Sequence, residues 1–541
     1  MYYMLSFNSP SSLITYWDEP TITLDYPEHP FHAIIKENWS SNLIPNMVLS
    51  SATLPKLHEL TDTVNDFTMK FSSSNSTVYN IVSHDCKKTI PIIDKNGNVI
   101  LPHFLSEDYD EMKLIVEHCA NYLTLLRYFD LKEVVRFISF IQKGNYVSAR
   151  HSILRNFASI DDIDMKNIKL YYLKLLKNII SGTWSSIYLT LKNTREKRIV
   201  PNETIDSKGI RKIRSIGPGI MTTTVSPDSC STKYAGESLS RIASAAPAPV
   251  PIRETSSGNC GIFVTTKDAY TLTDGPTIFL SNDVEKIAKF CIQQANIPAK
   301  VMSDIMEKIE FNNRINDKIS VLEKDLEDHD ASKAKEEDGD GEKKDHKCNR
   351  SQNNESQVEA GKIKTQLDTL RSMIKTATLN ETFIPNKNLH LKKWAEDCNV
   401  TGAFSSNIEE EFINEIMLLT GVADSWKVLL LMGIGVFTNH ENIAYTEIMK
   451  KMADEQKLYI IIASSDYIYG TNYQFCHGYI SKDLDLTQEK IIQAMGRIGR
   501  NNLQQNYSVR FRDDEQIMKL FTSNTEKPEI INMNRLFNSA V

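Results

Sequence analysis

Two arginines near the end of the chain, Arg497 and Arg500, have the type and spacing for phosphate chemistry. They lie in the string Gln493-Ala494-Met495-Gly496-Arg497-Ile498-Gly499-Arg500, whose glycines permit a tight turn beside each arginine. A guanidinium group is planar and permanently charged, so it suits a phosphate group better than an ammonium does. An arginine delivered to a transferring phosphoryl group is a recurring part of nucleotide hydrolysis. The same string also fits a basic surface turn, so further motifs must decide between the two readings.

An acidic pair at the other end of the chain provides the second group. Residues 13–17 are apolar and rich in β-branched and aromatic side chains, which predicts a short buried strand, and Asp18 and Glu19 follow it directly. Open α/β sheets bind their ligands at the carboxyl ends of their strands. One carboxylate there can hold Mg²⁺ through water while its neighbour orients an attacking water. A plain Asp-Glu-Pro turn is the alternative.

Two further strands are expected to end in hydrogen-bonding side chains. Residues 47–55 predict a strand that ends at Ser51 and Thr53, and residues 30–40 supply a helix for a strand-helix-strand crossover with the first strand. Far downstream, residues 457–466 form a continuous apolar strand followed by Gly470-Thr471-Asn472. Gly470 permits close backbone approach to a ligand, and the two polar side chains can bind it.

In this order, D-E-x-x, S-A-T, G-T-N and Q-x-x-G-R-x-G-R resemble the later motifs of superfamily-two helicases, most of all those of large nucleocytoplasmic DNA viruses. The resemblance implies ATP and Mg²⁺ as cofactors and DNA or RNA as partner. It implies that Asp18 holds Mg²⁺ through water and that Glu19 positions the attacking water. Gln493, Arg497 and Arg500 would reach the γ-phosphate. Ser51 and Thr53 would couple the nucleotide site to strand movement, and Gly470, Thr471 and Asn472 would contact nucleic acid or the nucleotide edge.

One part of such a motor is missing from the sequence, because no G-x-x-x-x-G-K-[ST] string occurs. That loop normally binds the β- and γ-phosphates through its backbone amides and lysine. The expectation is therefore the C-terminal part of a helicase, inactive alone, with a separate chain carrying the phosphate-loop half as partner. The alternative is a catalytically inactive nucleic-acid-binding or regulatory remnant of a split helicase.

The resemblance implies an α/β fold with RecA-like parallel-sheet motor domains, the first one incomplete. The expected segments are a remnant of the first motor domain (1–60), a hairpin and helical insertion (61–200), a Ser/Pro/Ala-rich linker (201–258), the second motor domain (259–300 and 380–541) and a coiled-coil hairpin with a disordered tip (301–379). Asn96-Gly97 predicts a turn between strands at 89–94 and 99–104. Apolar residues at 4-3-4 spacing, from Ile315 to Leu326 and from Ile363 to Ile374, predict the coiled coil.

Composition bears on how the protein could bind nucleic acid and on where it is located. The net charge of -7 means that nucleic-acid binding needs a local cationic groove rather than the overall field. Eight scattered cysteines without a C-x-x-C pair favour a reducing compartment. Neither a signal peptide nor an apolar run of membrane-spanning length is evident, so the expected location is intracellular: the host cytoplasm or the virion, if the protein is viral.

Overall fold

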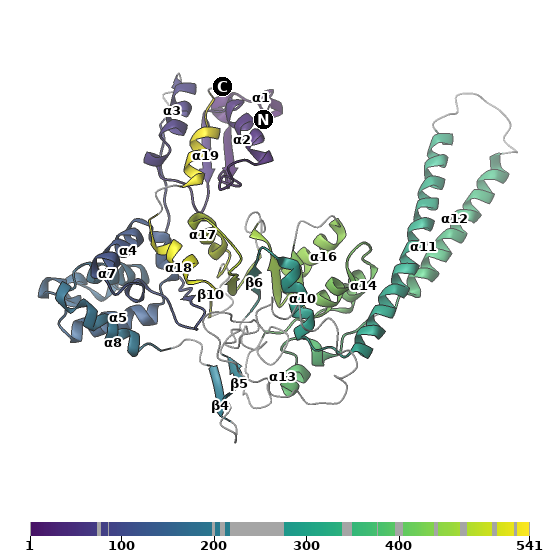
Figure 1. Cartoon of the computed structure of the whole chain (residues 1–541). Helices are drawn as coiled ribbons and strands as arrows, with labels where there is room; N and C mark the ends of the chain where they lie inside the picture. The colour runs from purple at the N-terminus through teal and green to yellow at the C-terminus, as the bar shows by residue number, and fades with distance from the viewer. Residues whose placement is uncertain are drawn as a thin grey trace.

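A six-stranded parallel sheet lies at the centre of the chain (Figure 1). The structure is a computed structural model, and it describes residues 2–72, 77–84, 86–196, 201–205, 211–216, 275–337, 349–375, 377–394, 404–437, 442–465, 473–499, 506–523 and 527–539. In spatial order the strands are β3 (Ile92–Ile93), β10 (Ser508–Phe511), β9 (His477–Ile480), β6 (Thr277–Leu280), β8 (Ile460–Ala463) and β7 (Ile434–Phe437). Every neighbouring pair is parallel.

The central strands are continuously buried; β6 and β8 are mostly apolar, whereas β9 and β10 also bury His477, Ser508 and Arg510. Every residue of β6, β8, β9 and β10 is buried. Parallel strands covered by helices on both faces have this continuous burial. The helices connected to the sheet are α10 (Val284–Gln294), α14 (Glu410–Leu418), α15 (Asp424–Leu431), α16 (Ile443–Asp454), α17 (Gln488–Gly496) and α18 (Asp514–Phe521). The mixed α/β class expected from the sequence is confirmed.

The edge strand β3 comes from the segment expected to be a separate insertion. The turn after it is as predicted: Gly97 has φ 84°, and the Asp94 carboxylate accepts hydrogen bonds from the backbone of Asn96 and Asn98 at 2.9 and 2.8 Å. The predicted return strand at 99–104 is wrong beyond its first residues. Pro102 begins a 3-10 helix, Pro102–Phe104, because proline has a fixed φ and no N–H for a strand ladder.

A helical region packs against the β10 side of the sheet and shares its hydrophobic core. It comprises α4 (Tyr109–Asn121), α5 (Leu131–Lys143), α6 (Ile153–Asn156), α7 (Met165–Lys177) and α8 (Trp184–Asn193). The Asp130 side chain caps α5 by accepting from the Glu133 N–H at 3.0 Å. The apolar stripe of α5 is buried in this core, as an amphipathic helix requires.

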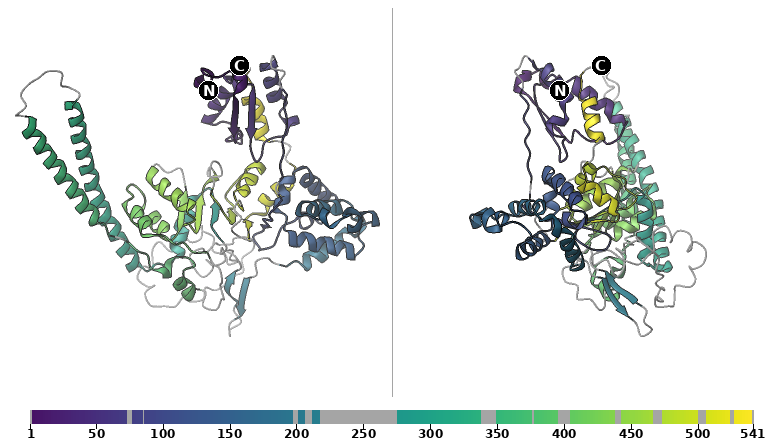
Figure 2. Two further views of the ribbon diagram at one scale, coloured as in Figure 1. Left: turned by 180° about the vertical axis from the view of Figure 1, so that it is seen from behind. Right: turned by 60° about the vertical axis from the view of Figure 1, so that its left-hand side comes forward.

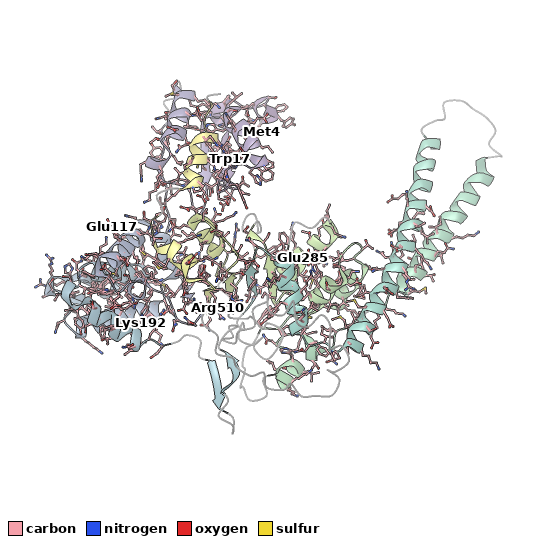
Figure 3. All side chains as sticks on the ribbon, viewed as in Figure 1. Met4, Trp17, Glu117, Lys192, Glu285 and Arg510 are labelled. Carbon is pink, nitrogen blue, oxygen red and sulfur yellow. The ribbon has the colours of Figure 1, made fainter. Side chains whose placement is uncertain are left out.

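A small unit at the top of Figure 1 is built from both ends of the chain. It contains α1 (Tyr2–Leu5), β1 (Ile14–Asp18), α2 (Pro30–Ser40), β2 (Asn46–Ser50), α3 (Thr61–Lys70) and α19 (Pro528–Leu536). β1 and β2 are parallel, with Asp18 beside Ser50. Its own core includes Trp39, Met533 and Phe537. Trp17, labelled in Figure 3, lies against Phe537 with ring centroids 5.2 Å apart.

The expectation that residues 13–17 form a buried strand is wrong in one respect. β1 alternates, and Ile14 and Tyr16 are 70% and 64% exposed; Val48, beside Tyr16 on β2, is 44% exposed. The side chains of Trp17, Met47 and Leu49 alternate with these and face the core made with α2, α3 and α19. No described element covers the opposite face, which we call the bare face (Ile14, Tyr16, Val48).

Two long helices, α11 (Ala299–Glu337) and α12 (Asn349–Ser372), lie side by side and extend away from the sheet (Figure 2). Ile315, Ile319 and Leu367 form their buried seam, at the positions that the 4-3-4 spacing predicts. At the base, the Asn312 side chain bonds the backbone of Lys375 in both directions, at 2.8 and 2.9 Å. The tip of the hairpin, at 338–348, lies outside the described residues.

Two smaller elements complete the described chain. The expected linker at 201–258 contains an antiparallel pair, β4 (Pro201–Ile205) and β5 (Arg211–Ile216), and its remainder lies outside the described residues. Helix α13 (Asn388–Trp394) lies between α12 and α14 in the sequence.

Candidate functional site

The acidic turn after β1 is held by hydrogen bonds from the strand beside it. The Glu19 N–H donates to the Ser50 carbonyl at 2.7 Å, and the Ser51 hydroxyl donates to Glu19 Oε2 at 2.9 Å. Glu19 has φ 49°, a left-handed conformation that a non-glycine residue adopts rarely. The Glu19 carboxylate therefore points toward the Ser51 turn. Asp18, one residue earlier, lies on the bare-face side of β1 and is exposed.

The Ser51–Thr53 turn connects this unit to α17. The Thr53 N–H donates to the Ser51 hydroxyl at 3.2 Å, and the Gln493 amide donates to the Thr53 hydroxyl at 2.7 Å. Thr53 and Gln493 are 440 residues apart in the sequence. The result is a continuous line of polar contacts, Glu19–Ser51–Thr53–Gln493, which we call the polar relay. The second amide atom, Gln493 Oε1, is buried without a hydrogen-bond partner.

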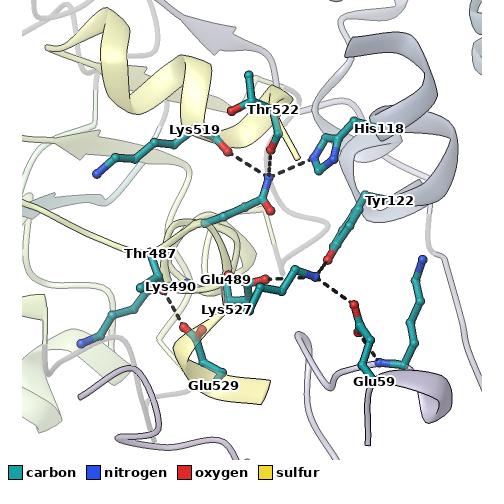
Figure 4. A network of polar contacts seen from close by, with 12 residues as sticks. Glu59, His118, Tyr122, Thr487, Glu489, Lys490, Lys519, Thr522, Lys527 and Glu529 are labelled. Carbon is teal, nitrogen blue, oxygen red and sulfur yellow. Dashed lines mark hydrogen bonds and ion pairs between the residues drawn. The ribbon is translucent and has the colours of Figure 1, made fainter. Parts of the chain in front are cut away.

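Helix α17 is buried on all sides, although four of its nine residues are polar. Thr487 caps its start, accepting from the Lys490 N–H at 3.3 Å and donating to Glu529 at 2.7 Å. Three consecutive side chains then reach three different neighbours, and Figure 4 shows the Glu489–Lys527 pair. Gln488 contacts His118 of α4 at 2.9 Å, Glu489 pairs with Lys527 at 3.7 Å, and Lys490 pairs with Asp25 at 2.7 Å. Buried polar groups carry such partners because an unpaired one is costly.

Burial and neighbouring charges shift the pKa values of two side chains of α17, Glu489 and Lys490. Burial, reinforced by the Glu529 carboxylate, raises the pKa of Glu489, while Lys527 opposes that shift. Burial alone would lower the pKa of Lys490, but its bonds to Asp25 and Tyr26 outweigh burial and raise it. Tyr26 places its hydroxyl 3.1 Å from Lys490 Nζ and its ring centroid 4.4 Å away. Lys490 is therefore held in its charged form between α17 and the small unit.

The remaining predicted site residues divide into two groups. Arg497 is the C-cap of α17 and is buried, one turn beyond Gln493 on the same helix. Gly470, Thr471, Asn472 and Arg500 lie outside the described residues. The structure thus brings Glu19, Ser51, Thr53 and Gln493 into direct contact, places Arg497 on the same helix, and leaves Asp18 exposed at the edge.

Several residues of this region were not identified from the sequence. Asp25, Tyr26, Lys490 and Lys527 make the contacts between α17 and the small unit, yet they lie in three separate segments. Lys490 and Asp25 are 465 residues apart, so no local spacing indicates the pair. Only Lys490, within the helix that leads to the arginines, lies inside a segment that the sequence motifs indicate.

Among the described residues, no group of three or more His, Cys, Asp or Glu side chains is placed to hold a metal ion. Within the same residues, no helix is both long and apolar enough to cross a membrane. Comparison with known proteins finds no matching family model and no matching curated protein.

Proposed function

We propose that this chain is the C-terminal part of an ATP-dependent, nucleic-acid-directed motor of the superfamily-two type. The observation that carries the proposal is the polar relay. It joins the D-E-x-x, S-A-T and Q-x-x-G-R-x-G-R strings, which come from opposite ends of the sequence, through bonds of 2.9, 3.2 and 2.7 Å. The parallel six-stranded sheet supports a second motor domain of RecA-like type, since such sheets bind ligands at the carboxyl ends of their strands.

The residues have distinct roles in this proposal. Glu19 orients the attacking water, and Ser51 holds its carboxylate. Thr53 and Gln493 transmit the state of the nucleotide site to α17, and Arg497 and Arg500 face the γ-phosphate. Gly470, Thr471 and Asn472 contact nucleic acid or the nucleotide edge. DNA and RNA both fit, because phosphate contacts carry no sequence information.

Magnesium fits this site in one limited way. Mg²⁺ is usually held by one or two carboxylates together with waters and substrate phosphates. Asp18 offers a single exposed carboxylate at the end of β1, which suits contact through water. An ion bound there together with ATP would neutralise part of the negative charge of the phosphates. Asp18 is the residue of this chain that would hold it.

The bare face supports a protein partner that carries the phosphate loop. Parallel strands are found almost always with both faces covered, yet Ile14, Tyr16 and Val48 leave one apolar face of β1 and β2 open. A polypeptide that covers this face would also border the exposed Asp18. The sequence contains no phosphate loop, so the proposal assigns that loop to the covering polypeptide.

A non-catalytic role is the second candidate, favoured by the same bare face and the exposed Asp18. In that role the chain binds nucleic acid and responds to a partner without hydrolysing ATP. The two candidates differ in whether ATP affects nucleic-acid binding through Glu19.

Fluorescence anisotropy with single-stranded DNA and RNA oligonucleotides tests the proposal, with and without ATP and Mg²⁺, on the chain completed with a phosphate-loop polypeptide. We expect binding that weakens as salt rises, and an effect of ATP that is lost in Glu19→Gln and Gln493→Ala. The matched control Glu37→Gln changes an exposed glutamate of α2 and should behave as wild type. Binding without any ATP effect would favour the non-catalytic role, and no binding at low salt would exclude both.

A further inference from the structure

Two cations from outside α17 hold the backbone turn that ends the arginine string. Lys88 Nζ donates to the Gly499 carbonyl at 2.8 Å. Arg127 Nη2 donates to the carbonyls of Ile498 and Gly499 at 3.0 and 3.1 Å. Both cations belong to the segment that the sequence indicated as an insertion, and they are 411 and 372 residues from Gly499 in sequence. Arg500 is the next residue in the chain.

The two cations are themselves joined. Ile90, two residues after Lys88, donates its N–H to the Arg127 carbonyl at 3.0 Å. The buried Ile90 side chain also lies under Gly499: a Cβ added at that glycine would be 2.8 Å from Ile90 Cδ1. The ring of Tyr507 lies under Lys88 Nζ, 5.3 Å from ring centroid to nitrogen. The turn is therefore contacted by three residues that are bonded or packed together: Lys88, Ile90 and Arg127.

The Ile498–Gly499 turn lies directly beyond the end of α17. Gly499 has φ 68°, which glycine adopts at little cost, and its N–H donates to the Phe475 carbonyl at 2.8 Å. The Ile498 and Gly499 carbonyls lie just beyond Arg497, the C-cap of α17, near the helix end that carries partial negative charge. Cations near that end interact favourably with this charge. Lys88 and Arg127 do so from the neighbouring region, so they fix the direction in which the chain leaves α17.

We propose that Lys88 and Arg127 are positioning residues for the arginine string, because they hold the Ile498–Gly499 turn that directly follows Arg497. We call the bonds from Lys88 and Arg127 to the Ile498 and Gly499 carbonyls the clamp. The clamp is independent of the proposed function, and only its catalytic consequence rests on that function. The segment at 61–200 thereby acquires a role, because Lys88 and Arg127 belong to it and hold the turn after Arg497.

The clamp is tested in the full chain by hydrogen exchange of peptides that contain Ile498 and Gly499. Arg127→Met and Lys88→Met each remove a charge-assisted bond to a carbonyl. We expect local opening to become roughly 10- to 100-fold more frequent at this turn in each variant. Peptides of β6 and β8 should keep wild-type exchange. Arg127→Lys, which retains a donor, should restore part of the protection.

Arg136→Met is the matched control, because Arg136 also donates to a backbone carbonyl, that of Thr194 at 2.7 Å, but does so away from the turn. It should leave exchange at Gly499 unchanged. In the presence of a phosphate-loop polypeptide that restores ATP hydrolysis, Arg127→Met should lower kcat roughly 10²-fold with KM near wild type, since small misplacement of a catalytic group costs about that much.

Two results would overturn the inference: exchange at Gly499 that stays unchanged in both methionine variants, or a loosened turn with unchanged kcat. Wild-type chain that never hydrolyses ATP with such a polypeptide would count against the proposed function instead. In that case the hydrogen-exchange measurement still tests whether Lys88 and Arg127 hold the turn.

Discussion

Glu19 shows how single residues are constrained at the proposed nucleotide site. A left-handed conformation at a non-glycine residue costs on the order of 1–3 kcal/mol and persists only where the surroundings enforce it. Here the Ser50 carbonyl and the Ser51 hydroxyl both bond Glu19. The backbone strain and the hydrogen bonds together keep the carboxylate directed at the relay.

Arg500 is the residue whose removal should affect hydrolysis most. In a preparation completed with a phosphate-loop polypeptide, Arg500→Ala should reduce ATP turnover roughly 10³- to 10⁵-fold, the range of arginine fingers. Oligonucleotide binding should remain nearly intact, because it is spread over many phosphate contacts. Arg500→Lys should recover little, since an ammonium lacks the bidentate geometry. Weakened binding with unchanged turnover would instead identify the segment as a basic surface turn.

His477 makes the stability of the sheet depend on pH. Burial, and then the nearby Arg510 guanidinium, lower the pKa of His477 from 6.5 to about 3. At pH values between about 3 and 6.5, His477 therefore carries a proton in the unfolded chain but not in the folded chain. The stability that this residue contributes is lost as pH falls below 6.5. The loss is about 1.4 kcal/mol for each pH unit, or roughly 2 kcal/mol at pH 5.

Urea unfolding at pH 7 and pH 5 measures this dependence. His477→Gln should reduce the difference in unfolding free energy between the two pH values by about 2 kcal/mol. His58→Gln, at an exposed position, is the control and should retain the wild-type difference. An unchanged pH dependence in His477→Gln would show that the His477 ring is solvated in solution.

Helix α19 belongs to the small unit although it comes from the far end of the chain. Met533 is fully buried there, whereas Ile531 on the same helix is 61% exposed. The Asn532 side chain donates to the carbonyls of Leu24 and Tyr26 at 2.8 and 2.9 Å, which fixes the helix against the first segment.

Met533→Ala should therefore loosen the small unit selectively. Removing a buried methionine side chain costs about 2–5 kcal/mol. Hydrogen exchange should rise in peptides from residues 14–71 and remain unchanged in β6 and β8, which belong to a different core. Ile531→Ala, on the exposed side of the helix, is the matched control. Equal loosening of the sheet in Met533→Ala would mean that the two cores unfold together.

The elements that could be predicted from the sequence are those with a local signal. Residues 460–463 are apolar throughout and form β8, and the helix expected at 30–40 is α2. The exposure of Ile14 and Tyr16 could not be predicted, because an apolar run does not specify how many of its faces are covered. The docking of α19 and the Lys490–Asp25 pair also escaped prediction, because each joins segments more than 460 residues apart. In the candidate site the motif strings gave the relay residues, but not their contacts.

The whole molecule should hydrolyse ATP negligibly by itself. The chain has no phosphate-loop string, and one face of β1 and β2 stays open. Phosphate release should stay at background with DNA, RNA or neither. Turnover above background that disappears in Glu19→Gln, but not in Glu37→Gln, would contradict this expectation and show that the chain binds the β- and γ-phosphates with other groups.

The small unit is tied to the rest of the molecule by two passages of the chain, one after α3 and one before α19 (Figure 1). Two covalent connections keep the small unit beside the rest of the molecule. When Thr53 and Gln493 separate, each therefore stays at a local concentration of about millimolar order relative to the other, as for groups joined by short linkers. Reclosing of the relay is then independent of protein concentration.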